Sequence, residues 1–219
     1  REVPCFCRAP REAKSKRMRI GIPIFDLVST LHFTGVERYT YNLVSNMTRL
    51  NRQDDFFIYH RFHQDPGRFG GFKTRRVIHR LYPKQMRSIA FKMDRIKILH
   101  LPVYFENIPY LVRGKNILTI QDLVPLFKPE WSMEGLPDYF SKLKREIGKI
   151  DIFIANSEHT KRDIMEHLGA PENKIKVVHL AADERYRPTS CASEIKDKYG
   201  LNSFILFVGT LEPRKNIPN

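Results

Sequence analysis

The sequence predicts an α/β domain of the doubly wound, Rossmann-like type, with helices on both faces of a parallel sheet. Short apolar runs alternate along the chain with segments of helical periodicity. Several of these runs are continuously apolar, as expected for strands that are buried on both faces. Right-handed crossovers then give a doubly wound sheet, whose ligands bind at the carboxyl ends of the strands.

The first predicted strand covers residues 19–25, an apolar run that follows a charged segment. It includes Pro23, which lacks a backbone donor, so this strand is not expected to be regular throughout. From residue 36 to residue 50 apolar side chains recur at helical spacing and predict the first helix. Thr34 is its predicted N-cap, and Glu37 follows with the spacing of a capping box.

Five further strands are predicted from apolar runs, at residues 55–59, 98–101, 116–120, 152–155 and 175–180. Residues 63–75 are rich in glycine and charge and predict a loop. One helix is expected over residues 138–149. Another begins after Ser157, its predicted N-cap, and ends before Gly169.

A polar segment without apolar periodicity at residues 183–193 is interpreted as an interdomain linker. After it a helix is predicted at residues 194–199, with Gly200 as its C-cap, and a strand at 204–208. The expected organisation is a disordered basic tail, a first Rossmann-like domain, the linker and the truncated start of a second domain, at residues 1–19, 20–182, 183–193 and 194–219.

The net charge of the 219-residue chain is +14, from 38 basic and 24 acidic side chains. Almost all of the excess lies in residues 1–19 and residues 73–97, so the rest of the chain is close to neutral. Two basic patches on a neutral body indicate a locally anionic partner, such as a lipid surface, a nucleic acid or a phosphorylated substrate. No DNA- or RNA-binding motif is present, and a nucleic-acid partner is therefore not expected.

Cysteine and histidine usage excludes two classes of protein. The chain has three cysteines, which do not make a disulfide framework and favour a reducing, cytoplasmic compartment. Its eight histidines show no metal-ligand spacing, so no zinc site is predicted. No apolar run approaches the roughly 18 residues of a transmembrane helix.

Residues 84–97 predict a basic amphipathic helix. Its apolar residues share one face and are Met86, Ile89, Ala90, Met93 and Ile96. Two interpretations stay open: the helix lies on an anionic membrane, or its apolar face packs in the core while its charges face solvent. In the first interpretation the membrane face consists of Lys84, Arg87, Lys92, Arg95 and Lys97.

Residues at three predicted strand ends have the chemistry to bind a ligand. After the strand at 204–208, Gly209 allows close approach of the backbone, and Arg214 and Lys215 supply the charge to hold a diphosphate. The alternative is a surface turn with two solvated cations. At the turn after the first strand the G-x-G-x-x-G motif is absent, because Gly35 stands alone there, so a dinucleotide-binding domain is not predicted.

The second candidate site is Thr34-Gly35-Val36-Glu37-Arg38, where the turn after the first strand admits a phosphate or a sugar. The alternative is a helix start that needs no ligand. The third is Gln121-Asp122, whose amide and carboxylate can hydrogen-bond sugar hydroxyls. The alternative there is that Asp122 only caps the turn before Pro125.

The order and spacing of these segments resemble the N-terminal half of a GT-B-fold retaining glycosyltransferase of family four. Asp183, Tyr186 and Pro188 add to the resemblance, which spans residues 20–216. It is carried by residues 34–39, 118–125, 154–161 and, most specifically, Leu206 to Asn216.

The resemblance implies two Rossmann-like domains, of which the first binds the acceptor and the second a UDP- or GDP-sugar donor without a metal. The implied reaction transfers a hexose, commonly mannose or glucose, to a glycan or glycolipid with retention at the anomeric carbon. Arg214 and Lys215 match the pair that holds the donor diphosphate, and Gly35 matches the glycine near the donor phosphates. Thr34, Glu37 and Arg38 belong to the acceptor side, and Gly209 to the diphosphate site.

The chain departs from the family pattern at two points. Gln121 stands where many members have a histidine near the transferred sugar, and Gln121 and Asp122 are the catalytic candidates. The family's Glu-x7-Glu pair is absent, so the isolated chain is predicted not to catalyse hexose transfer.

Two other hypotheses for the function stay open: a non-catalytic acceptor- or sugar-binding domain of a degenerate relative, and, less favoured, a nucleic-acid-binding protein. The resemblance also favours a peripheral location on the cytoplasmic face of a membrane.

Overall fold

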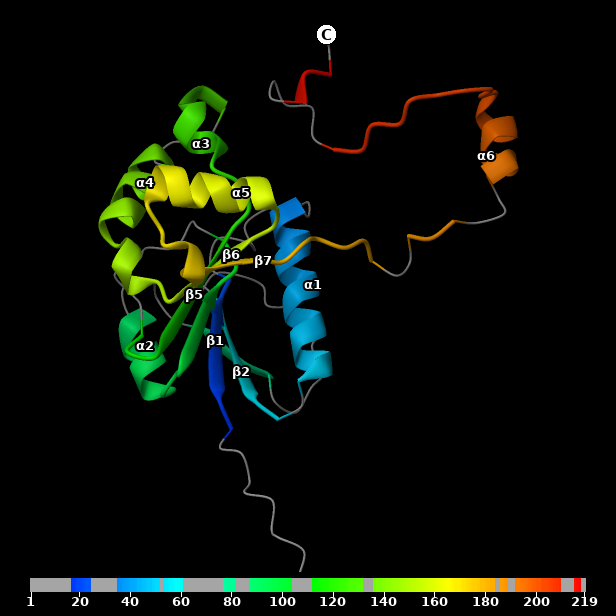
Figure 1. The fold of residues 1–219 in the computed structure, drawn as a ribbon. Helices are drawn as coiled ribbons and strands as arrows, with labels where there is room; N and C mark the ends of the chain where they lie inside the picture. The colour runs from blue at the N-terminus through cyan, green and yellow to red at the C-terminus, as the bar shows by residue number, and fades with distance from the viewer. Residues whose placement is uncertain are drawn as a thin grey trace, which may run out of the picture. The chain divides into compact units, whose positions relative to one another are not determined.

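The computed structural model describes the chain at residues 17–24, 35–51, 53–60, 77–81, 87–103, 112–131, 136–183, 186–188, 192–209 and 215–217 (Figure 1). These residues contain a seven-stranded sheet in the order β3-β2-β1-β4-β5-β6-β7. The strands are β1 Arg19–Pro23, β2 Asp55–His60, β3 Val77–Leu81, β4 Ile98–Leu101, β5 Lys115–Ile120, β6 Ile152–Ala155 and β7 Ile175–Val177.

The strand order confirms the predicted doubly wound α/β class. Each of the pairs β1–β2, β2–β3, β1–β4, β4–β5 and β6–β7 is parallel. From β1 the chain continues to β2 and β3 on one side, and then returns to β4 on the other side. The strand order therefore reverses between β1 and β4, and ligands of such sheets bind at the carboxyl ends of the strands at that point.

The chain divides into two compact units. The first consists of residues 1–119 and 149–152, and the second of residues 120–148 and 153–219. The domain boundaries expected around residues 183–193 stay predictions.

Alternate residues of β1 in the first unit face two different helices, as a sheet buried on both faces requires. Ile20, Ile22 and Ile24 belong to a core cluster with Val44 of helix α1 (Gly35–Leu50). On the other face, a Cβ on Gly21 would lie 3.1 Å from Ile96, just after helix α2 (Arg87–Met93). Figure 1 shows α1 and α2 on opposite sides of these strands.

The first predicted strand is confirmed over Arg19–Pro23, and residue 25 of the predicted range lies outside the described residues. The strand hydrogen bonding continues for one more residue, because the Ile24 amide donates to the Tyr59 carbonyl at 3.0 Å. Proline at the last position of β1 is compatible with a central strand there.

Strand β3 was not predicted from the sequence. It pairs with β2 in parallel and forms the edge of the sheet. Its sequence, VIHRL, lies within the basic segment 73–97 and contains a histidine and an arginine, which obscure the apolar signal. An edge strand tolerates such residues because only one side of its backbone is paired.

Helix α2 ends at Met93, four residues before the end of the helix predicted at 84–97, whose residues 84–86 lie outside the described residues. Its predicted apolar face is wrong in part: Ala90 is buried as predicted, and so is Ile96, which follows the helix. Ala90 and Phe91 are buried, whereas Ile89 and Met93 are 49% and 68% exposed. The Phe91 ring packs edge-on against the Tyr59 ring with centroids 4.7 Å apart, which fixes the rotation of the helix. The helix ends at Met93, and Arg95 adopts a left-handed φ of 52°.

In the second unit the local helix signals are confirmed. Helix α4 (Leu136–Arg145) begins two residues before the helix predicted at 138–149, whose last residues form the 3-10 turn η5 (Ile147–Lys149). Helix α5 (Glu158–Asp163) begins after Ser157. The Ser157 Oγ accepts a hydrogen bond from the Thr160 amide at 3.0 Å, as expected of an N-cap. Helix α5 continues as a π-helical turn, η6 (Ile164–Leu168), and Gly169 ends it with a φ of 75°.

Two short helical segments between β5 and α4 were not predicted. They are α3 (Val124–Phe127) and the 3-10 turn η4 (Pro129–Trp131). Phe127 packs edge-on against His167 with ring centroids 4.7 Å apart, and Lys128 Nζ lies 5.5 Å from the centroid of the half-exposed Trp131 ring.

The predicted helix near residue 194 is confirmed, but the strand at 204–208 is not. Helix α6 (Ala192–Tyr199) is followed by Gly200 with a φ of 62°, as expected of a C-cap glycine. Residues 201–209 have no strand pairing, and Ile205 is fully exposed. A strand requires a hydrogen-bonded neighbour, and residues 204–208 lack one among the residues that the structure describes.

Candidate functional site

The residues predicted at the start of the first helix lie at its N-terminus. Gly35 is the first residue of α1 and is exposed, and a Cβ added to it would meet no atom within 4 Å. Glu37 is 3% exposed, and Arg38 is exposed. An acidic residue in the first turn of a helix is favoured by the helix dipole. Thr34 lies outside the described residues.

A buried polar cluster joins the first turn of α1 to the ends of two strands in the first unit. His100 Nε2, on β4, is hydrogen-bonded to Thr119 Oγ1, on β5, at 3.0 Å. The Thr119 side chain also hydrogen-bonds Tyr39 of α1. Burial lowers the pKa of His100 to about 4 and raises the pKa of Tyr39. His100 is therefore a neutral imidazole at pH 7.

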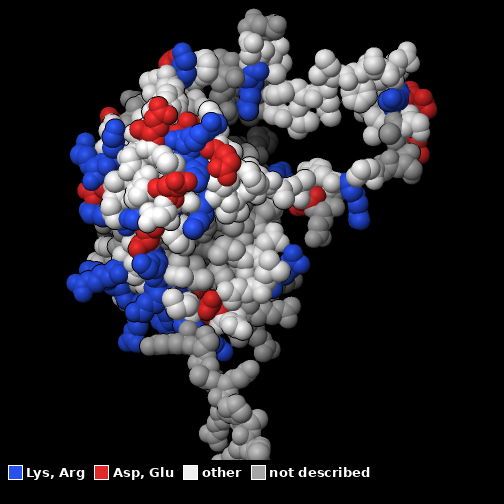
Figure 2. All heavy atoms as spheres, in the orientation of Figure 1, with Lys and Arg blue, Asp and Glu red and all other residues white. Residues whose placement is uncertain are grey.

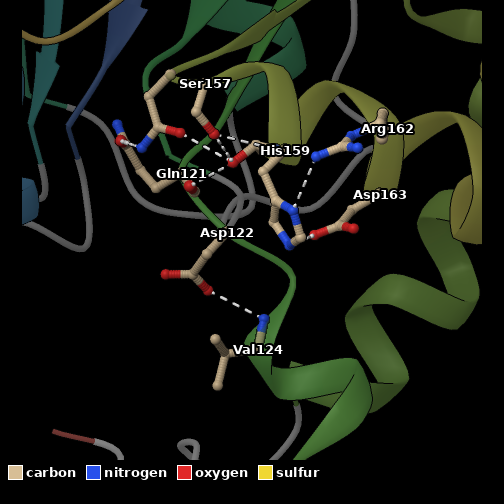
Figure 3. A network of polar contacts seen from close by, with 9 residues as sticks. Gln121, Asp122, Val124, Ser157, His159, Arg162 and Asp163 are labelled. Carbon is tan, nitrogen blue, oxygen red and sulfur yellow. Dashed lines mark hydrogen bonds and ion pairs between the residues drawn. The ribbon is translucent and has the colours of Figure 1, made fainter.

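Asp122 follows β5 and performs the capping role that the sequence left open. Its Oδ1 accepts a hydrogen bond from the Val124 amide at 3.2 Å, directly before Pro125 of α3 (Figure 3). This bond involves one carboxylate oxygen, so capping does not exclude a contact between Asp122 and a ligand.

Gln121 belongs to a network with the start of helix α5 (Figure 3). Its Oε1 accepts a hydrogen bond from Asn156 Nδ2 at 3.1 Å. Thr160 Oγ1 donates to Asn156 Oδ1 at 2.9 Å and lies 3.0 Å from Ser157 Oγ. The Nε2 atom of Gln121 is buried and has no hydrogen-bond partner among the described residues.

Of the three residues predicted to bind a diphosphate after the strand at 204–208, the structure describes Gly209 and Lys215. Gly209 and Lys215 are exposed, and the strand expected to end at Gly209 does not form. Arg214 lies outside the described residues. The prediction that a buried strand positions this group is therefore wrong for the described structure, because the strand has no neighbour to pair with.

Basic side chains gather over α2. Figure 2 shows Lys and Arg side chains crowded on the part of the surface where Figure 1 places this helix. Lys92, Arg95 and Lys97 are exposed there, beside the exposed Ile89 and Met93. Lys84 and the side chain of Arg87 lie outside the description.

Within the described part of the chain, no group of three or more His, Cys, Asp or Glu residues is arranged to hold a metal ion. In the same residues, no helix has both the length and the apolar content needed to cross a membrane.

Sequence reasoning did not single out His100, Thr119, Asn156 or Thr160 as individual site residues. The available signal was a polar residue inside an apolar strand: His100 in ILHL and Thr119 in KNILTI. Burying such a residue is unfavourable for folding unless the residue is hydrogen-bonded. Its presence in an apolar strand therefore indicates a cluster of hydrogen-bonded polar side chains.

The comparison with known proteins identifies a family and similar proteins. Residues 33–186 match the family described as Glycosyltransferase Family 4. The O-antigen chain mannosyltransferase B of Escherichia coli is 23% identical over 209 residues, which cover 84% of this chain and 54% of that protein. The serotype-specific mannosyltransferase WbdA of Escherichia coli is 29% identical over 121 residues, covering 51% of this chain and 14% of that protein.

A solved structure is similar in fold. The glycosyltransferase from Rickettsia africae ESF-5 gives a TM-score of 0.51 at 15% sequence identity, covering 86% of this chain and 51% of that chain. The chain thus spans about half the length of the mannosyltransferase B and of this structure. The family match includes α1, β4, β5 and α5, which carry the two polar networks. With most of its length inside that match, the chain belongs to Glycosyltransferase Family 4.

Proposed function

We propose that the chain is the acceptor-side half of a glycosyltransferase that moves a hexose from a UDP- or GDP-sugar to a glycan or glycolipid, with retention at the anomeric carbon. The family match over residues 33–186 carries the proposal. Mannose is the favoured sugar, because the two Escherichia coli relatives are named mannosyltransferases. The donor is a substrate, and no metal or cofactor takes part.

The polar groups after β5 have the chemistry for this role. Gln121 offers an amide donor, and Asp122 retains a carboxylate oxygen beyond the one that accepts from the Val124 amide. Both groups hydrogen-bond hydroxyls well. Among the described residues no atom lies within 4 Å of a Cβ added to Gly35, at the N-terminus of the 16-residue helix α1, and helix N-termini favour anions such as phosphate. Arg214, Lys215 and Gly209 remain the proposed diphosphate group.

A transfer assay tests the proposal. The polypeptide encoded by the coding DNA read past the Asn219 codon is incubated with GDP-mannose, UDP-glucose and mannoside acceptors, and the product anomer is identified by NMR. We expect mannose transfer with retention, and none from the 219-residue chain alone. Transfer with inversion would overturn the retaining mechanism, and turnover by the isolated chain would overturn the half-enzyme proposal. No transfer from any donor would favour a non-catalytic sugar-binding role.

Gly35→Ala is expected to separate ligand binding from stability. The added methyl group meets no protein atom within 4 Å, so the free energy of unfolding should change by less than about 0.5 kcal/mol. If a donor phosphate approaches the backbone here, the methyl group should lower kcat/KM at least about tenfold, because loss of one anion-binding contact is worth 1–3 kcal/mol. Gly148→Ala, also in open space, is the control. Unchanged transfer by Gly35→Ala would remove Gly35 from the site.

A second proposal concerns the α2 surface, which we expect to lie on an anionic membrane at its cytoplasmic face. The observation that favours it is the exposure of Ile89 and Met93 beside Lys92, Arg95 and Lys97. Apolar side chains that enter the headgroup region, surrounded by cations, are typical of interfacial helices.

Vesicle sedimentation tests this second proposal. The chain is expected to sediment with phosphatidylglycerol-containing vesicles but not with pure phosphatidylcholine, and added salt should release it. The double variant Ile89→Ser, Met93→Ser should lower the partition coefficient about tenfold or more, from the apolar area withdrawn from the membrane. Leu50→Ser, which changes an exposed leucine at the end of α1, serves as the matched control. Equal binding to neutral vesicles would contradict the proposal.

A further inference from the structure

The two ends of the Gln121 amide have different environments. The Oε1 atom accepts a hydrogen bond from Asn156 Nδ2 at 3.1 Å. The Nε2 atom is buried and makes no hydrogen bond to the described residues. Buried amide donors are nearly always satisfied, so an oxygen atom of a ligand is the natural partner for this one.

The Asn156 amide sets the orientation of the Gln121 amide. Asn156 Oδ1 accepts a hydrogen bond from Thr160 Oγ1 at 2.9 Å, so Nδ2 is the atom that faces Gln121. A rotation of the Asn156 amide alone would place its oxygen against the Gln121 oxygen, and two acceptors repel. The orientations of the two amides are therefore coupled through this contact.

Thr160 is held in turn by the start of helix α5. Its backbone amide donates to Ser157 Oγ at 3.0 Å, and its Oγ1 also lies 3.3 Å from the Gln121 carbonyl oxygen. Thr160 is 5% exposed, so its hydroxyl makes these contacts without competition from solvent. The Thr160 hydroxyl carries one hydrogen and faces acceptors at both the Asn156 side chain and the Gln121 backbone, which favours the donor role assigned to it.

We propose that Asn156 and Thr160 are positioning residues that hold the Gln121 amide with Oε1 occupied and Nε2 free to donate a hydrogen bond to a hydroxyl oxygen of the bound sugar. The proposal rests on the proposed function and extends it to residues outside the ligand contact itself. An amide does not gain or lose a proton in the physiological pH range, so Gln121 orients the sugar and does not act as an acid or a base.

Matched substitutions separate positioning from structure. Thr160→Val removes the hydroxyl at nearly constant volume, whereas Thr160→Ser keeps it. Asn156→Asp replaces the donor that faces Oε1 with an acceptor, so the Gln121 amide should rotate and Nε2 should bind the carboxylate. Gln121→Glu removes the free donor directly.

The readout is the NMR signal of the Gln121 side-chain amide in the 219-residue chain, assigned by its loss in Gln121→Glu, with methyl α-D-mannopyranoside as the probe. Adding the sugar should shift this signal. Thr160→Val, Asn156→Asp and Gln121→Glu should each weaken sugar binding about fivefold, the equivalent of one hydrogen bond. Thr160→Ser should stay within about twofold of the parent chain, as a hydroxyl-dependent role requires.

The outcomes distinguish this proposal from the proposed function. In the absence of sugar, Asn156→Asp should move the Gln121 amide signal, and an unmoved signal would overturn the proposed orientation. A sugar response in other residues but not at Gln121 would overturn the donor role of Nε2 alone. The lack of any response to the sugar would overturn the sugar-binding function itself, and with it the assigned partner of Nε2. Equal binding by Thr160→Val and Thr160→Ser would overturn the role of the hydroxyl.

Discussion

Lowering the pH from 7 to 4 is expected to reduce the free energy of unfolding by about 3 kcal/mol through His100 alone. Burial holds the pKa of this imidazole at about 4 in the folded chain, against 6.5 for an exposed histidine. Between these two values the unfolded chain binds a proton that the folded chain does not. Stability contributed by the neutral ring is therefore complete above pH 6.5 and falls as the pH decreases towards 4.

Urea unfolding at several pH values between 7 and 4 measures this effect. Carboxylates also titrate at the acid end, so the quantity of interest is the difference between the parent chain and His100→Gln, which does not titrate. We expect this difference to shrink by about 3 kcal/mol over the range. His179→Gln, at an exposed position, is the control for replacing a histidine outside the buried cluster. The same pH dependence in the parent and in His100→Gln would show that the ring is not buried as a neutral group.

Gly114→Ala should be the most destabilising single-methyl substitution considered for this chain, at about 3 kcal/mol or more. An added Cβ would lie 2.0 Å from the carbonyl oxygen of Lys97, well inside the van der Waals contact distance. That carbonyl accepts the hydrogen bond from the Lys115 amide at 2.8 Å, where the pairing of β4 with β5 begins. Because the obstacle is backbone, a side-chain rotation does not relieve the clash.

Gly148→Ala provides the comparison for this clash. A Cβ on Gly148 meets no atom within 4 Å, so the substitution should change the free energy of unfolding by no more than about 0.5 kcal/mol. Urea denaturation of both variants gives the two values. Hydrogen exchange at the Lys115 amide should be accelerated in Gly114→Ala, because the first β4–β5 hydrogen bond is lost. Equal stability of the two variants would contradict the close approach of residues 97 and 114.

Features set by neighbouring residues were predicted from the sequence. The Ser157 cap, the glycine after α5 and the capping role open to Asp122 depend on contacts over a few positions, and all three are present. Strands such as 98–101 and 152–155 were found because a short apolar run between polar segments has few other stable placements.

Features that depend on distant partners were not predicted. The hydrogen bond from Asn156 to Gln121 joins residues 35 positions apart, and no local pattern indicates it. The rotation of α2 is fixed by the contact of Phe91 with Tyr59, a strand residue, so the helical period alone placed Ile89 and Met93 wrongly on the buried face. The strand expected at 204–208 failed for the same reason, since an apolar run forms a strand only beside another strand.

Trp131 can serve as an intrinsic fluorescence probe of this protein. It is the only tryptophan of the chain, it is 43% exposed, and it lies in the short helical segment that follows Asp122. Emission excited at the red edge of aromatic absorption therefore comes from a single position. A sugar or nucleotide that reorders the segment after β5, or displaces Lys128 from the indole ring, would change that emission, so ligands can be screened on the unlabelled chain.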